Sequence, residues 1–124
     1  MSDSIVKIKS FELAISGVNF YKYLVSEKKE FVMSKQFLRS ITSVGANVRE
    51  AVNAQSKLDF IHKLAIAQKE CDESIYWLEL LKATDYITEN DFDKINTKAV
   101  EVLKIIRSIS ITTKKNLKLA TNNS

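Results

Sequence analysis

The sequence predicts an all-α protein, an antiparallel up-down-up-down bundle of four helices. Proline is absent and glycine occurs only twice in 124 residues, whereas strand-rich folds need many turns that draw on both residue types. Apolar residues recur at three- and four-residue steps along four successive segments, which is the spacing of amphipathic helices. The connections between these segments are short, and short connections favour antiparallel neighbours.

The first helix is expected from about Ser10 to Lys28, with Ser10 as its N-cap. Residues 1–9 are expected to form an N-terminal lead-in, and the pattern leaves open whether Ile5 and Ile8 extend the helix or pack beside it. The apolar stripe that should face the core consists of Phe11, Ile15, Val18, Tyr21 and Val25.

The second helix is expected from Ser34, its N-cap, to about Asn53, after a turn at residues 29–33. Small residues such as Gly45 and Ala46 let a neighbouring backbone approach closely. The predicted core stripe is Phe37, Ile41, Val44, Val48 and Val52. The opposite face carries Lys35, Arg39, Arg49 and Asn53, which an ordinary solvated helix face explains well.

The third helix is expected from Ser56 to Thr84, where Ser56 and Asp59 form a box-like N-terminal signature. One apolar stripe consists of Phe60, Leu64, Ala67, Cys71, Ile75, Leu78 and Leu81. A second stripe lies on nearly the opposite side and consists of Ile66, Trp77 and Leu80. A helix that faces one core needs only one apolar stripe. The second stripe therefore predicts contact with another copy of the chain.

Glu73 lies within this second stripe, between Ile66 and Trp77. Because an unpaired buried charge is costly, we expect a cationic partner for Glu73 in the same or a neighbouring subunit, or an exposed position at the edge of the stripe. The candidate partners are Arg39, Arg49 and Lys69. The candidate residues of an interface between copies are Ile66, Glu73, Trp77 and Leu80.

The fourth helix is expected from about Glu89 to Thr113, preceded by a second box formed by Thr88 and Asp91. Its apolar seam consists of Phe92, Ile95, Ala99, Val102, Ile106 and Ile109. The bundle should thus span residues 10–113. The remaining residues, 114–124, are expected to be a flexible basic and polar tail.

The net charge of +4 is unevenly distributed along the chain. Residues 1–69 carry a net +5, residues 70–101 a net −6, and residues 102–124 a net +5. An up-down-up-down topology brings the chain start, the second connection and the end of the last helix to one pole, which should be basic. Clustered positive charge attracts phosphate backbones. The candidate nucleic-acid contacts are Arg49, Lys57, Lys63, Lys104 and Arg107.

Few residues suit catalysis or a cofactor. His62 and Cys71 are the single histidine and cysteine, so neither a His pair nor a Cys cluster can bind metal. Glu70, Glu73 and Glu79 lack the Glu-x-x-His pairs of carboxylate-bridged metal bundles. We therefore expect no enzyme activity, no metal and no cofactor. No bilayer-spanning run or signal-peptide core is apparent, which predicts a cytoplasmic protein with no membrane partner. Base-specific reading has little support, because no exposed aromatic is expected at the basic pole.

Two segments, RSITSVGANVREA at residues 39–51 and SKLDFIHKLAIAQKECDES at residues 56–74, resemble the four-helix bundle family of 23S rRNA intervening-sequence proteins. The matching positions are Ser43, Asn47, Glu50, Ser56, Phe60, Ala67, Glu73 and the Tyr-Trp-Leu at 76–78. The resemblance covers about residues 10–110. Ala51 stands where the family usually has Gly, and the Pro often found in the first turn is missing.

The resemblance implies an all-helical subunit that assembles into a five-membered homo-oligomeric ring. One branch of the family is encoded in segments inserted in bacterial 23S rRNA genes. A related branch is the accessory protein of diversity-generating retroelements, which works with a reverse transcriptase and binds nucleic acid. Neither branch is known as an enzyme.

Two functions follow as hypotheses. The first is a homo-oligomeric protein that binds nucleic acid, RNA above all, through its basic pole. The second is a protein-interaction or scaffold subunit, in which the basic pole serves solubility or an acidic protein partner. Reversal of the charges at the basic pole separates the two hypotheses, since only the first requires those charges for RNA retention.

Overall fold

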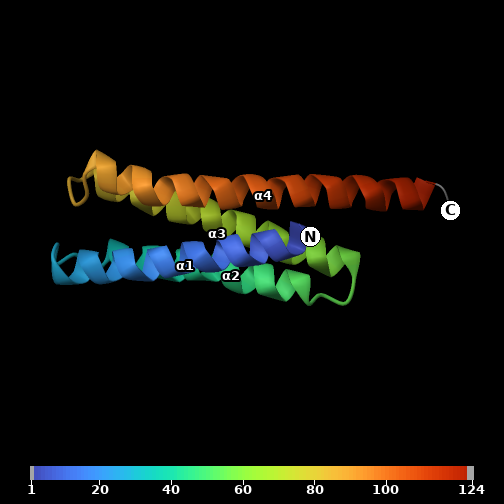
Figure 1. The fold of residues 1–124 in the computed structure, drawn as a ribbon, viewed down its shortest axis with the longest axis horizontal. Coiled ribbons are helices and arrows are strands. Elements are labelled where there is room, and N and C mark those ends of the chain that lie inside the picture. The colour runs from blue at the N-terminus through green and yellow to red at the C-terminus, as the bar shows by residue number, and fades with distance from the viewer. Residues whose placement is uncertain (1, 123–124) are drawn as a thin grey trace.

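The computed structural model describes the backbone of residues 2–122 and the side chains of residues 5–120. It contains four helices: α1 (Ser2–Ser26), α2 (Met33–Val52), α3 (Lys57–Ala83) and α4 (Glu89–Asn122). Each helix runs antiparallel to the one before it, and the pairs that pack together are α1–α2, α2–α3, α3–α4 and α1–α4 (Figure 1). The predicted up-down-up-down bundle is confirmed, with α1 and α3 at opposite corners.

Both terminal segments are more helical than expected. Residues 2–9 continue α1, so Ile5 and Ile8 extend the helix, and Ser10 is a buried residue in its interior instead of the N-cap. The Ser10 hydroxyl donates to the carbonyl oxygen of Lys7 at 3.2 Å. The expected tail is likewise helical over residues 114–122, while residues 123–124 lie outside the described part. Lys, Leu and Ala are good helix formers, and no Pro or Gly interrupts them.

The start of α2 is held by Glu30 and not by Ser34. The Glu30 carboxylate accepts hydrogen bonds from the backbone N–H groups of Val32 and Met33, both at 3.1 Å, and of Ser34 at 2.6 Å. Burial tends to raise the pKa of Glu30, but these backbone donors hold it below its ordinary value of 4.5. The expected N-cap role of Ser34 is wrong because Glu30 already satisfies the free N–H groups of the first turn.

The other helix starts agree with the sequence analysis. The Ser56 hydroxyl accepts the N–H of Asp59 at 3.0 Å at the start of α3. At the start of α4, Thr88 Oγ1 accepts the N–H of Asp91 at 3.1 Å, while the Asp91 carboxylate accepts the N–H of Thr88 at 3.4 Å. These hydrogen bonds fix where each helix begins, and hence the short connections that the bundle needs.

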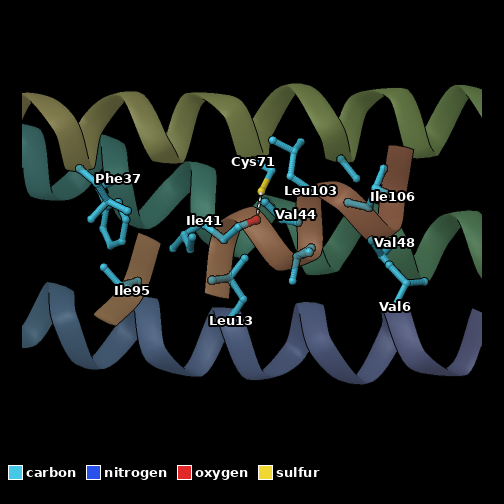
Figure 2. Close-up of a cluster of buried hydrophobic side chains, with 14 of the residues drawn as sticks. Val6, Leu13, Phe37, Ile41, Val44, Val48, Cys71, Ile95, Leu103 and Ile106 are labelled. Atoms are coloured by element: carbon cyan, nitrogen blue, oxygen red, sulfur yellow. Dashed lines mark hydrogen bonds between the residues drawn. The ribbon is translucent and has the colours of Figure 1, made fainter. Parts of the chain in front are cut away.

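The core lies between all four helices (Figure 2). The predicted stripes of α2, α3 and α4 supply most of it: Phe37, Ile41, Val44, Val48, Leu64, Ala67, Cys71, Leu78, Leu81, Phe92, Ile95, Ala99, Val102 and Ile106 are buried. Val52, Phe60, Ile75 and Ile109 are partly buried against this cluster. Three of the four predicted core faces are therefore confirmed.

The predicted core face of α1 is wrong. Phe11 and Ile15 are 54% and 48% exposed, whereas Val6, Leu13 and Leu24 are buried. Val18, Tyr21 and Val25, the rest of the expected stripe, are only partly buried. The inward face of α1 is thus the one with fewer large side chains.

A glycine on α1 explains this choice of face. A Cβ placed on Gly17 would lie 2.5 Å from Cγ2 of Ile41 on α2, and one on Gly45 would lie 3.3 Å from the backbone oxygen of Ser10. Both glycines of the chain therefore lie where α1 and α2 approach closely. This close approach requires the small-residue face of α1 to turn inward, which leaves Phe11 and Ile15 outside.

Candidate functional site

The three segments that the topology assigns to the basic pole lie at the same end of the bundle: the start of α1, the α2–α3 connection and the C-terminal part of α4 (Figure 1). The five candidate cations, however, divide into two groups within this region. Arg49, Lys57 and Lys63 surround the α2–α3 connection at residues 53–56, whereas Lys104 and Arg107 lie on α4.

Carboxylates neutralise part of the positive charge of the first group. Lys63 Nζ lies 3.1 Å from the carboxylate of Glu50. Both residues line an open hollow of about 940 Å³ that also contains Arg49 and Asp59. Lys57 is exposed and forms no ion pair with any residue that the structure describes. Arg49 and Lys57 are therefore the cations of this group best placed to meet a phosphate.

The Arg49 side chain lies against an aromatic ring, that of Phe11, which was expected in the core but is exposed. The guanidinium carbon of Arg49 is 5.9 Å from the centroid of the Phe11 ring, a distance at which a cation is attracted to the ring face. Phe11, Lys7 and Arg49 line a groove of about 440 Å³ between α1 and α2. The expectation that no exposed aromatic lies at the basic pole is therefore wrong.

The second group of cations belongs to a longer series on α4. Lys104 is exposed, and Arg107 lies 3.8 Å from the carboxylate of Asp72 on α3. Lys114, Lys115 and Lys118 follow on the same helix and are all exposed. Residues 102–124 contain no acidic residue. The expected flexible tail is wrong for these three lysines, which continue the helix of Lys104 and Arg107.

The partner of Glu73 is Arg39 of the same chain, one of the three candidates. Arg39 Nη1 also binds the Glu70 carboxylate at 3.1 Å, and this contact raises the pKa of Arg39. The indole Nε1 of Trp77 donates to Glu73 at 3.3 Å. This network links α2 to the outer side of α3, so Arg39 is part of an ion pair and not simply a solvated charge.

The second stripe of α3 is half-buried in the isolated chain. Ile66, Trp77 and Leu80 all keep part of their surface exposed, although Trp77 also packs against the edge of the core. Tyr76 is 53% exposed, and its ring lies 5.2 Å from that of Trp77. Apolar surface is therefore present on the outer side of α3, and the interface between copies stays a prediction.

A second outward apolar surface lies on α1, at the opposite corner of the bundle. Its members share one helix and are each about half exposed: Ile5 51%, Ile8 57%, Phe11 54% and Ile15 48%. The spacing of Phe11 and Ile15 predicts an apolar stripe, and that stripe exists. It faces outward, whereas the expectation was that it faces the core.

The single cysteine and histidine offer little chemistry. Cys71 Sγ lies 3.3 Å from the carbonyl oxygen of Ala99, and burial raises the pKa of the Cys71 thiol to about 12. The thiol is therefore protonated at neutral pH and is a poor nucleophile. His62 is exposed on α3.

Neither a metal site nor a membrane-spanning helix is found among the described residues. Within them, no three His, Cys, Asp or Glu side chains gather closely enough to hold a metal ion. No helix in residues 2–122 combines the length and the apolar character needed to cross a bilayer.

Comparisons with known proteins place this chain in a family. The family model described as "23S rRNA-intervening sequence protein" matches residues 2–108. A crystal structure of a protein of unknown function from the S23 ribosomal protein family of Bacteroides thetaiotaomicron VPI-5482 is 57% identical, with a TM-score of 0.87. The match covers 89% of this chain and 98% of that one. No curated protein sequence matches. The chain therefore belongs to the 23S rRNA-intervening sequence protein family.

Proposed function

We propose that this protein is a non-enzymatic, homo-oligomeric subunit that binds nucleic acid, RNA above all, through its basic pole. The observation that carries the proposal is the charge of the C-terminal part of α4, where residues 102–122 hold five cations and no acid. Arg49 and Lys57 add exposed positive charge at the same pole. A polyanion is the partner that such a surface attracts at long range and without sequence preference.

Assembly is supported by the two outward apolar surfaces. One lies on α1 around Ile8, Phe11 and Ile15, and the other lies on α3 around Ile66 and Trp77. Because α1 and α3 are at opposite corners, contact between these two different surfaces joins copies head to tail. Such contacts close into a ring when the rotation between copies permits, and the family resemblance implies five copies.

A ring would strengthen weak phosphate contacts. Each copy repeats the same cations, so a long polyanion that meets several poles at once binds more tightly than a single pole would hold it. The resemblance implies two settings, an rRNA insertion and a retroelement with its reverse transcriptase, and both contain long RNA that could meet several poles at once. That this protein binds RNA in one of these settings is part of the proposal.

RNA binding is tested by fluorescence anisotropy with a labelled 20-nucleotide hairpin at several salt concentrations. We expect affinity to fall about tenfold or more between low and moderate salt, because phosphate contacts release bound counterions. The triple variant Arg49→Glu, Lys57→Glu, Lys104→Glu should bind weakly. Its matched control is Lys22→Glu, Lys28→Glu, Lys35→Glu, which reverses three exposed cations away from the basic pole and should bind nearly as wild type. Binding that ignores salt would contradict the proposal.

Assembly is tested with Trp77→Asp and sedimentation velocity. We expect a lower oligomeric state with the helical content retained, because the charge would have to be buried between copies. Burial of a side chain of this size contributes about 2–3 kcal/mol per copy. If the variant unfolds, Trp77 acts mainly in the core of its own subunit. Ile66→Asp then provides the second measurement, since Ile66 lies on the same outer side of α3.

The apolar surface of α1 favours a second function, a protein-interaction or scaffold subunit without a nucleic-acid role. Ile8, Phe11 and Ile15 form a stripe that suits a protein partner as well as another copy. Under this function, the basic-pole triple variant would retain both assembly and its capture of a protein partner, and wild type would bind the RNA hairpin no better than the variant.

A further inference from the structure

We infer that the outer face of the last turns of α4, from Lys104 to Lys118, is the surface that binds the phosphate backbone of double-stranded RNA. This inference rests on the proposed function and gives it a specific location and ligand. The surface, called the α4 basic face below, consists of Lys104, Arg107, Lys114, Lys115 and Lys118.

The helical register places these five cations together. At about 100° per residue, their positions fall within about 100° of arc around the helix axis. The core residues Val102 and Ile106 lie on the other side of the same helix. From Lys104 to Lys118 the face extends about 21 Å at 1.5 Å per residue. A straight row of charges of this length matches the backbone of a duplex better than it matches a small anion.

The cations are available for a ligand. Lys104, Lys114, Lys115 and Lys118 are exposed and form no ion pair with any residue that the structure describes. Arg107 approaches Asp72 at 3.8 Å, and both side chains are about half exposed, so this pair is weak and easily replaced. The C-terminal part of α4 also projects past the other three helices, which leaves its sides open (Figure 1).

Repulsion between its lysines destabilises the projecting segment of α4, and a bound polyanion would remove that repulsion. Lys114 and Lys118 are four residues apart, and Lys115 and Lys118 are three apart, so like charges lie side by side and weaken the helix. Beyond Ser110, no described residue of α4 is fully buried, so little packing offsets this repulsion. Phosphate groups would neutralise it, and binding should therefore make this segment more rigid.

The composition of the face favours a duplex over an unpaired strand. Residues 101–120 contain no Phe, Tyr or Trp, so no ring is present on which bases could stack. The large apolar residue near the centre of the face is Ile111, which is 67% exposed and has no aromatic ring. Because the face cannot stack on bases, its binding should depend on the RNA backbone and not on the base sequence.

The family match covers only part of the α4 basic face. The matched segment ends at residue 108, so Lys114, Lys115 and Lys118 lie beyond it, whereas Lys104 and Arg107 lie within it. We therefore expect the projecting part of α4 to extend a shorter basic surface and to strengthen RNA binding by this chain in particular.

The test uses the full-length triple variant Lys114→Glu, Lys115→Glu, Lys118→Glu and a labelled 20-base-pair RNA duplex. We expect at least a tenfold loss of affinity at about 0.1 M salt. The slope of log affinity against log salt should also become shallower by about two to three, because three phosphate contacts are lost. The matched control is again Lys22→Glu, Lys28→Glu, Lys35→Glu. A second variant, with the same three lysines changed to Gln, lowers the charge without adding acid and should lose less affinity.

A second readout follows the rigidity of α4. Hydrogen exchange of the amides of residues 111–120 should slow when wild type binds the duplex, and should not change in the Glu variant. Circular dichroism and the thermal midpoint should show that the bundle in residues 5–106 remains folded in every variant.

The outcomes separate this inference from the proposed function. If the Lys114, Lys115, Lys118 variant binds the duplex as wild type does while Arg49→Glu, Lys57→Glu weakens binding, the inference is wrong and the proposed function stands. If neither variant weakens binding, both are wrong. Tighter binding to a single strand than to the duplex would overturn the inference that the face binds the backbone of a duplex. The same variants are also tested for binding to vesicles that contain anionic phosphatidylserine. If the Glu variant loses binding only to these vesicles and not to the duplex, the inference is wrong and the face binds a lipid surface.

Discussion

The neighbouring helices α1 and α2 differ in how well their sequences reveal their buried faces. On α2 the predicted stripe from Phe37 to Val48 is buried, whereas on α1 the predicted stripe containing Phe11 and Ile15 is exposed. α2 has a single apolar stripe, so its inner side is unambiguous. α1 carries apolar residues on two sides, and the side with larger residues faces outward. Apolar periodicity therefore identifies a helix but does not choose between two candidate faces.

The largest expected effect comes from the inner face of α1. Leu13 is fully buried, so Leu13→Ala should lower the free energy of unfolding by about 3 kcal/mol, through lost burial and the cavity left behind. In the monomeric chain, the matched change on the outer face, Ile15→Ala, should cost less than about 1 kcal/mol because Ile15 is 48% exposed there. Urea denaturation measures both, at a protein concentration low enough to keep the chain monomeric. Equal losses would mean that Ile15 is as buried in solution as Leu13.

Gly17 tests why α1 presents this face. In Gly17→Ala the new Cβ would lie 2.5 Å from Cγ2 of Ile41, so α1 and α2 must separate or Ile41 must move. We expect a loss of about 1–3 kcal/mol, the usual cost of overpacking. In the double variant Gly17→Ala, Ile41→Ala the two clashing atoms Cγ1 and Cγ2 are gone, so its loss should be smaller than the sum of the losses in the two single variants. If Gly17→Ala raises the thermal midpoint, the close approach of α1 and α2 at Gly17 does not explain which face of α1 is buried.

Glu30 tests the connection between α1 and α2. Glu30→Gln should cost about 1.5 kcal/mol at pH 7, since hydrogen bonds to a charged group are the stronger ones. The folded-state pKa of Glu30 lies below its ordinary value of 4.5, so its contribution is complete above that pH and is lost as the pH falls through the folded-state pKa. Wild type and variant should therefore converge in acid. A constant difference from pH 7 to pH 2 would assign the effect to packing.

The smallest expected effect is a gain at Lys29 in the same connection. Lys29 has a φ of 53°, a left-handed conformation that costs a side-chain-bearing residue about 1 kcal/mol. Lys29→Gly should therefore raise the free energy of unfolding by about 0.5 kcal/mol, because Gly relieves the strain but loses more chain entropy. Lys28→Gly is the control and should give no gain, and thermal denaturation compares the two.

At the candidate site, too, the sequence predicted the arrangement of segments better than the contacts between side chains. The start of α1, the α2–α3 connection and the end of α4 meet at one end of the bundle as expected, because this depends only on helix order and short connections. The pairing of Lys63 with Glu50 and of Arg107 with Asp72 could not be predicted, since these partners lie on different helices and depend on how the helices are rotated. For Glu73 the sequence left open a cationic partner or an exposed position at the edge of the stripe, and only the structure decided for a partner and selected Arg39 from the three candidates.

The sequence alone determined the four helices, their antiparallel order, two of the helix caps and the uneven charge, because these follow from local spacing and composition. The tertiary structure decided which side of α1 is buried, how Glu30 holds the start of α2, and that α4 continues as a projecting basic helix. The physical reason is that local pattern fixes the form of each segment, whereas its rotation and its neighbours depend on close packing at points such as Gly17 and Ile41.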